Sequence, residues 1–205
     1  MSKFSRIFVS AIFVIVLVIL SGCGTGSSVT RVSADTQTDL SGRWNDTDAK
    51  LVAEGMISDV LSRTWRDDFL QETGEKPKLI VGRIRLKDAT EHIKTNGFVK
   101  DMERELINSG MVRFVASSEE RKEVRAERLD QQSFASESTA KRLANEKGAD
   151  FMLQGSITMY VDAVDGQQVK FYQVDLELLD LESSEKVWMG SKKIKKSVER
   201  QKTSW

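Results

Sequence analysis

Hydrophobic residues follow a helical period in three parts of the chain. Apolar residues recur at three- and four-residue steps between residues 49 and 61, which predicts an amphipathic helix. Asn45 or Thr47 is expected to cap the start of this helix. Residues 98–107 predict a second helix, stopped by a glycine, and residues 138–147 predict a third helix that also ends at a glycine.

Short apolar runs between these helices predict five strands. Residues 79–85 and 111–116 give the first two, and the strictly alternating residues 151–161 give the third. Residues 172–178 and 186–195 follow as two further strands after short turns. Each of the last three strands has one polar face. The pattern therefore predicts an α+β fold: a mixed sheet with a C-terminal antiparallel meander and helices packed mainly on one face.

The first 22 residues are typical of an export signal. Two basic residues precede an apolar run over residues 7–20, which is shorter than the roughly 20 residues that span a bilayer. Small residues then precede Cys23, the single cysteine of the chain, and this order predicts cleavage before Cys23 and lipidation of its thiol. Gly24 follows where an Asp would retain a lipoprotein in the inner membrane, so we expect anchoring in the outer membrane of a Gram-negative host, on the periplasmic side.

Three regions follow from these patterns. Residues 1–22 form the signal peptide, residues 23–42 the lipidated cysteine with a flexible polar tether, and residues 43–205 a single folded domain. The signal region holds two of the 31 basic residues and none of the 31 acidic ones, so the mature chain carries a net charge of about −2. A charge this close to zero gives no reason to expect nucleic acid binding.

Catalytic chemistry has little support in the sequence. His92 is the only histidine and lies in a polar loop, as a solvated side chain would. One histidine and one lipidated cysteine do not provide the three or four ligands of a zinc site without carboxylates. No phosphate-binding or dinucleotide motif is visible. We therefore expect no enzyme activity, metal, cofactor or small-molecule substrate.

Partner binding has better candidates, although each also has a simpler interpretation. Carboxylates two residues apart suit any exposed sheet face, clustered lysines protect an edge strand, and a tryptophan in a helix is usually part of the core. The candidates are Trp65, Arg83, Arg85, Asp175, Glu177, Lys193 and Lys195.

Several stretches together resemble one family. They are SGRWNDTD at 41–48, LIVG at 79–82, LINSG at 106–110, VRFV at 112–115, ANEKGADFMLQG at 144–155, and FYQVDLEL at 171–178 followed by KVW at 186–188. This combination, in this order and behind a cysteine suited to lipidation, is similar to the LpoB family, the lipoprotein activators of penicillin-binding proteins. The resemblance covers residues 41–196.

The resemblance implies a periplasmic domain that is not an enzyme. Such a domain would bind a bifunctional, class A penicillin-binding protein and stimulate its glycan polymerisation and crosslinking. The tether departs from the family pattern, because it is short and lacks proline. Only Cys23 carries over from the family by position, as the lipidation site.

Two rival functions remain open at this point. The first is an outer-membrane assembly or secretion accessory without a synthase partner, because the curli secretion lipoprotein carries similar short motifs. The second is an envelope hydrolase, which would need converging titratable groups around His92 or a carboxylate pair.

Overall fold

The computed structural model describes residues 29–33, 36, 38–39, 41–134, 148–164 and 167–199. The chain divides into two compact units, Met1–Thr36 and Gln37–Trp205. The second unit contains a five-stranded sheet in the order β2-β1-β3-β4-β5. Strands β1 (Lys78–Lys87), β2 (Arg113–Phe114) and β3 (Phe151–Val164) run parallel, whereas β4 (Gln167–Asp180) and β5 (Lys186–Glu199) form an antiparallel meander with β3. The predicted α+β class and the C-terminal meander are confirmed.

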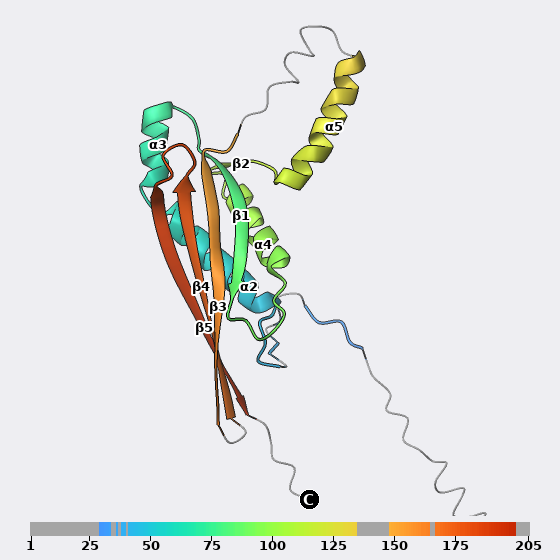
Figure 1. Cartoon of the computed structure of the whole chain (residues 1–205), viewed down its shortest axis with the longest axis vertical. Helices are drawn as coiled ribbons and strands as arrows, with labels where there is room; N and C mark the ends of the chain where they lie inside the picture. Colours follow the sequence, from blue (N-terminus) through green and yellow to red (C-terminus); the bar gives the residue numbers. More distant parts are fainter. Residues whose placement is uncertain are drawn as a thin grey trace, which may run out of the picture. The chain divides into compact units, whose positions relative to one another are not determined.

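Helices cover one face of this sheet, which we call the helix face. Helices α2 (Asp46–Leu61) and α4 (Thr95–Asn108) lie together behind the strands in Figure 1, and α3 (Trp65–Thr73) follows α2 at one end. Helix α5 (Ser118–Phe134) follows β2. The described residues place no helix against the opposite face, which we call the open face.

Helix α2 begins where its sequence supplies a cap. The Asn45 side chain accepts a hydrogen bond from the Asp48 backbone N–H, and the Asp48 carboxylate accepts one from Asn45 N, so the two residues form a reciprocal capping box. The predicted apolar stripe is buried along the whole helix. Asn45, rather than Thr47, is therefore the cap.

The alternation of the meander strands determines which side chains enter the core. In β4, Tyr172, Val174, Leu176 and Leu178 are buried on the helix face, as predicted. In β3 the same holds from Phe151 to Met159. Polar and half-buried side chains alternate with them on the open face. The sheet therefore has one apolar side, which a single layer of helices buries.

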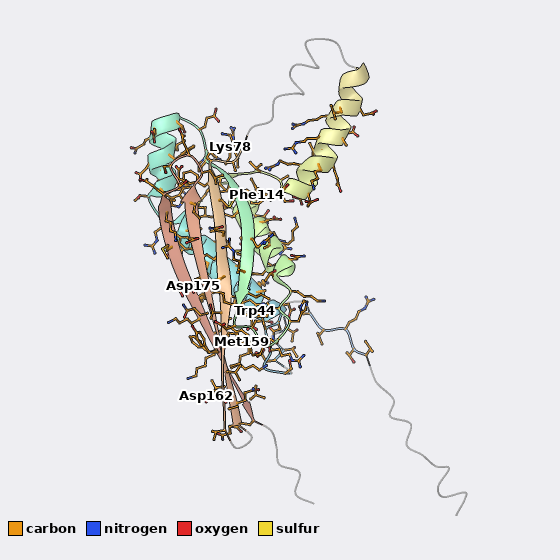
Figure 2. All side chains as sticks on the ribbon, in the orientation of Figure 1. Trp44, Lys78, Phe114, Met159, Asp162 and Asp175 are labelled. Carbon is orange, nitrogen blue, oxygen red and sulfur yellow. The ribbon has the colours of Figure 1, made fainter. Side chains whose placement is uncertain are left out.

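The meander strands are longer than the sequence pattern indicated. Strand β1 pairs with β3 only as far as Thr158, but β3 and β4 continue as a paired ladder to Val164 and Gln167, and β5 continues to Glu199. These strand ends project beyond the helices in Figure 1, and Asp162 marks this part in Figure 2. We call this part the strand extension. Because no helix covers it, even the apolar Val161 is exposed there.

Residues before position 43 also contact the folded domain. The unit begins at Gln37, and Asp39 accepts hydrogen bonds from Asn45 Nδ2 and from Lys196 Nζ. The carbonyl of Gly42 also accepts a hydrogen bond from the Tyr172 hydroxyl. Residues predicted as tether therefore contact the domain. The predicted signal peptide, Cys23, the helix over residues 138–147 and the turn at residues 165–166 lie outside the described residues.

Candidate partner-binding site

The open face brings five of the predicted partner-binding residues onto one surface. Residues that pair directly across neighbouring strands point to the same side of a sheet. Arg85 is aligned with Ser156, Ser156 with Asp175, and Asp175 with Ser191, which forms one row across four strands. Figure 2 shows Asp175 midway along the strands.

The rows on either side of Asp175 carry the other charged candidates. Glu177 pairs with Gln154 and Met189 on one side, and Lys193 pairs with Gln173 on the other. Lys195 lies one further row along, opposite Phe171. Successive rows are about 6.6–6.8 Å apart, because side chains repeat on one face every second residue. The open face therefore changes from acidic around Glu177 to basic around Lys195.

Glu177 is held ionised at the acidic end of this face. Its carboxylate lies 2.6 Å from Lys186 Nζ and accepts a hydrogen bond of 2.9 Å from Gln154 Nε2. The hydrogen bond from Lys186 lowers the pKa of Glu177, and the charge of nearby Arg85 lowers it further. Asp175 accepts hydrogen bonds of 2.9 and 3.0 Å from Gln173 Nε2. These side chains form a surface with charges of both signs, which suits a charged partner.

Two of the candidates do not join this surface. Trp65 is 6% exposed, its Nε1–H donates to the Val60 carbonyl at 2.7 Å, and its ring lies edge-on to Phe151 at 5.0 Å. Trp65 is therefore a core residue and not the accessible anchor that was predicted, because its ring packs inside the domain and its indole N–H is hydrogen-bonded there. Arg83 is exposed in a bulge where it and Gly82 together oppose Gln154, so it belongs to no cross-strand row.

A buried polar cluster that no sequence pattern indicated lies at the base of the strand extension. Glu91 Oε1 accepts hydrogen bonds from the Tyr172 hydroxyl at 2.6 Å and from the Trp44 backbone N–H at 2.9 Å. Glu91 Oε2 pairs with Lys170 Nζ at 2.8 Å, and both of these side chains are only 10% exposed. We call Trp44, Glu91, Lys170 and Tyr172 the Glu91 network. This network connects Trp44, at the start of the domain, and the loop after β1 to the helix face of β4.

Lys196 forms a second buried ion pair beside this network. Its ammonium lies 2.6 Å from both Asp48 and Asp39 and donates to the Arg43 carbonyl at 3.0 Å. Burial opposes the charged form of Lys196, but the hydrogen bonds to the two carboxylates outweigh it and raise its pKa. The lysine cluster of β5 is therefore divided: Lys193 and Lys195 face outward, and Lys196 secures the domain entry.

Acid is expected to weaken the fold through Glu91. Burial opposes its ionisation, but the hydrogen bonds from Lys170 and Tyr172 outweigh burial and lower its pKa below the usual 4.5. A carboxyl with a lowered folded-state pKa stabilises the fold above its unfolded-state pKa, and this contribution disappears as the pH falls through the folded-state value. Urea denaturation should therefore show the unfolding free energy falling below about pH 4.5.

The matched comparison is between Glu91→Gln and Glu72→Gln, because Glu72 is exposed on α3. Glu91→Gln should flatten the acid dependence, whereas Glu72→Gln should leave it as in the unmodified protein. Equal acid slopes in all three proteins would show that Glu91 does not control this dependence.

The helices also form a shallow groove away from the open face. It has a volume of about 460 Å³ and lies between α2 and the end of α4, with Glu54, Glu105 and Met111 among its lining residues. His92 does not contribute to it and is exposed in the loop after β1. The described residues contain no group of three or more side chains suited to bind a metal ion.

Comparisons with known proteins identify relatives of this domain. A family model described as peptidoglycan-synthase activator LpoB matches residues 48–194. The C-terminal domain of LpoB from Salmonella enterica is 18% identical, covers 75% of this chain and 99% of its own, and has a TM-score of 0.39. The corresponding domain from Escherichia coli is 17% identical, covers 72% and 98%, and has a TM-score of 0.42.

A further solved structure is similar over a shorter part of the chain. Lipoprotein GNA1162 from Neisseria meningitidis is 13% identical, covers 62% of this chain and 88% of its own, and has a TM-score of 0.36. No curated protein sequence matches the chain.

Proposed function

Because this chain belongs to the LpoB family of peptidoglycan-synthase activators, we propose that it binds a bifunctional, class A penicillin-binding protein through the open face of its sheet. Binding would stimulate the synthase by favouring its more active conformation, which requires a higher affinity for that conformation than for the inactive one. The family match over residues 48–194 is the observation that supports this most directly. The accessible charged rows of the open face support its location.

The proposed docking surface consists of Arg85, Asp175, Glu177, Lys193 and Lys195. Charged rows of both signs fix the orientation of a partner and exclude partners with the wrong pattern. Lys193 and Lys195 form no salt bridge with another described residue, and Arg85 is exposed beside Glu177.

The anchor proposed for this domain is a lipid on Cys23, inserted in the outer membrane. Gly24 is compatible with transport to that membrane. In the described part of the chain, none of the helices has the length and apolar character to cross a bilayer. The family consists of periplasm-facing lipoproteins, which agrees with a domain that works in the periplasm.

Charge reversal on the open face should weaken binding of the synthase. We expect Asp175→Lys and Arg85→Glu each to lower the recovery of a class A penicillin-binding protein at least tenfold, because like charges then face each other across the interface. The measurement is a pull-down from solubilised envelopes with the purified mature lipoprotein as bait.

Two exposed residues away from the open face provide matched controls. Glu72→Lys on α3 and Lys94→Glu before α4 make the same changes of charge. Both should recover the synthase as the unmodified protein does. Unchanged recovery with both Asp175→Lys and Arg85→Glu would place the docking surface elsewhere. Recovery of other outer-membrane components without any synthase would favour the assembly function instead.

A further inference from the structure

Two aromatic rings and two lysines gather on the open face where the strand extension begins. Tyr160 pairs with Phe171 across β3 and β4, and Phe171 pairs with Lys195 across β4 and β5. The two ring centroids are 5.7 Å apart with an interplanar angle of 49°, and Lys193 Nζ lies 5.9 Å from the centroid of Phe171. We call Tyr160, Phe171, Lys193 and Lys195 the basic–aromatic patch.

The side chains of this patch are accessible. Tyr160 is 54% exposed, and both lysines are exposed without an ion pair to any described residue. The next row adds the exposed Lys87, which aligns with Thr158. Asp162 and Asp175 lie in the rows on either side, so the patch is a basic strip bordered by single carboxylates.

The strands behind the patch are held firmly. Lys170 and Tyr172, the neighbours of Phe171 in β4, belong to the Glu91 network on the helix face. Lys196, the neighbour of Lys195 in β5, is buried in its pair with Asp48. These contacts hold β4 and β5 at Phe171 and Lys195, and β3 is held at Tyr160 by its pairing with β4, so the patch is preorganised for binding.

We propose that the basic–aromatic patch binds a glycan strand that carries carboxylated side groups, the type of polymer that a peptidoglycan synthase makes. The C–H faces of sugar rings are weakly positive and pack on the negative faces of aromatic rings. Lysines placed beside the rings pair with carboxylates. The choice of this polymer rests on the proposed function. Lys193 and Lys195, the basic edge of the proposed docking surface, would contact the glycan, and the synthase would be bound beside it at Arg85, Asp175 and Glu177.

An anionic membrane surface is the main competitor for such a patch. Lysines beside aromatic residues also attract lipid head groups. The geometry favours the glycan, because the Phe171 side chain is half-buried against Tyr160 and would insert less deeply into a bilayer than a fully exposed ring.

Cosedimentation with insoluble peptidoglycan sacculi tests the proposal. The purified mature lipoprotein, in detergent, should pellet with the sacculi. Tyr160→Thr and Phe171→Thr should each raise its Kd about tenfold, the scale of one aromatic contact. Met189→Thr removes another exposed apolar side chain of the open face, and it should bind as the unmodified protein does. Tyr160→Phe, which keeps the ring, should also bind normally.

Three results would overturn the proposal. They are absence of the unmodified protein from the pellet, equal pelleting of Tyr160→Thr, and release from the sacculi when phosphatidylglycerol is added to the micelles, which would identify a lipid site. If Phe171→Thr fails to fold, Tyr160→Thr still tests the proposal, because Tyr160 is mostly exposed. The same preparations are scored for synthase recovery, so loss of glycan binding alone leaves the proposed function standing.

Discussion

Glu91→Ala is expected to lower the free energy of unfolding by about 3–5 kcal/mol, the usual cost of removing one member of a buried ion pair. The substitution leaves Lys170 charged and only 10% exposed. It also removes the acceptor of the Tyr172 hydroxyl and of the Trp44 backbone N–H. Urea denaturation followed by tryptophan fluorescence measures the loss.

A double variant separates the cost of an unpaired charge from the value of the pair itself. Glu91→Leu with Lys170→Met replaces both charges by apolar groups of similar size, and it should recover the part of the stability that Glu91→Ala loses through the unpaired charge of Lys170. Glu72→Ala, which removes an exposed carboxylate of α3, should change stability by less than about 0.5 kcal/mol. A loss below about 1 kcal/mol in Glu91→Ala would mean that water reaches Lys170 freely.

Cys23→Ser should abolish incorporation of labelled palmitate into the protein. The chain has no other cysteine, so no second thiol is available for the lipid. An acyl chain contributes about 0.8 kcal/mol per buried methylene, and stable anchoring requires two such signals. The substitution also removes the cysteine from the predicted cleavage site, so the Cys23→Ser protein should keep its signal peptide and have a larger mass in cells.

Gly24→Asp is the matched control for this experiment. It should keep the palmitate label but move the protein from the outer-membrane fraction to the inner-membrane fraction. Label that persists in Cys23→Ser would disprove lipidation at this thiol, and an unmoved Gly24→Asp protein would contradict the sorting role of this position.

Much of the fold could be predicted because it depends on local periodicity. The alternation of Tyr172, Val174, Leu176 and Leu178 identifies the buried face of β4. The cap residue Asn45 and the apolar stripe after it give the start and the buried side of α2. Since both patterns arise within a few residues of each other, they can be read from the sequence without the tertiary structure.

The buried polar contacts could not be predicted because their partners are distant in the sequence. Glu91 stands in a polar loop, and it bonds Lys170 and Tyr172 at separations of 79 and 81 residues. In the sequence, Lys196 cannot be told apart from the exposed lysines beside it, because Asp39, one of its partners, is 157 residues away. Without the fold, a buried ionic side chain has the same local sequence as a solvated one.

The candidate surface could be predicted in part. The face shared by Asp175, Glu177, Lys193 and Lys195 follows from strand alternation, and the ladder brings Arg85 beside them. Trp65 required the structure, because its burial depends on Phe151 and on a carbonyl of α2. Tyr160 and Phe171 also required the structure, since only the register of β3 against β4 brings them together.

The most direct measurement is the rate of glycan polymerisation by a purified class A penicillin-binding protein of the same host, with and without this lipoprotein. We predict a higher rate with the unmodified protein and with Glu72→Lys, and no increase with Asp175→Lys or Arg85→Glu. A rate that the unmodified protein leaves unchanged would contradict the activation of this synthase class. A rate that all four proteins raise equally would contradict the open face as the site of contact.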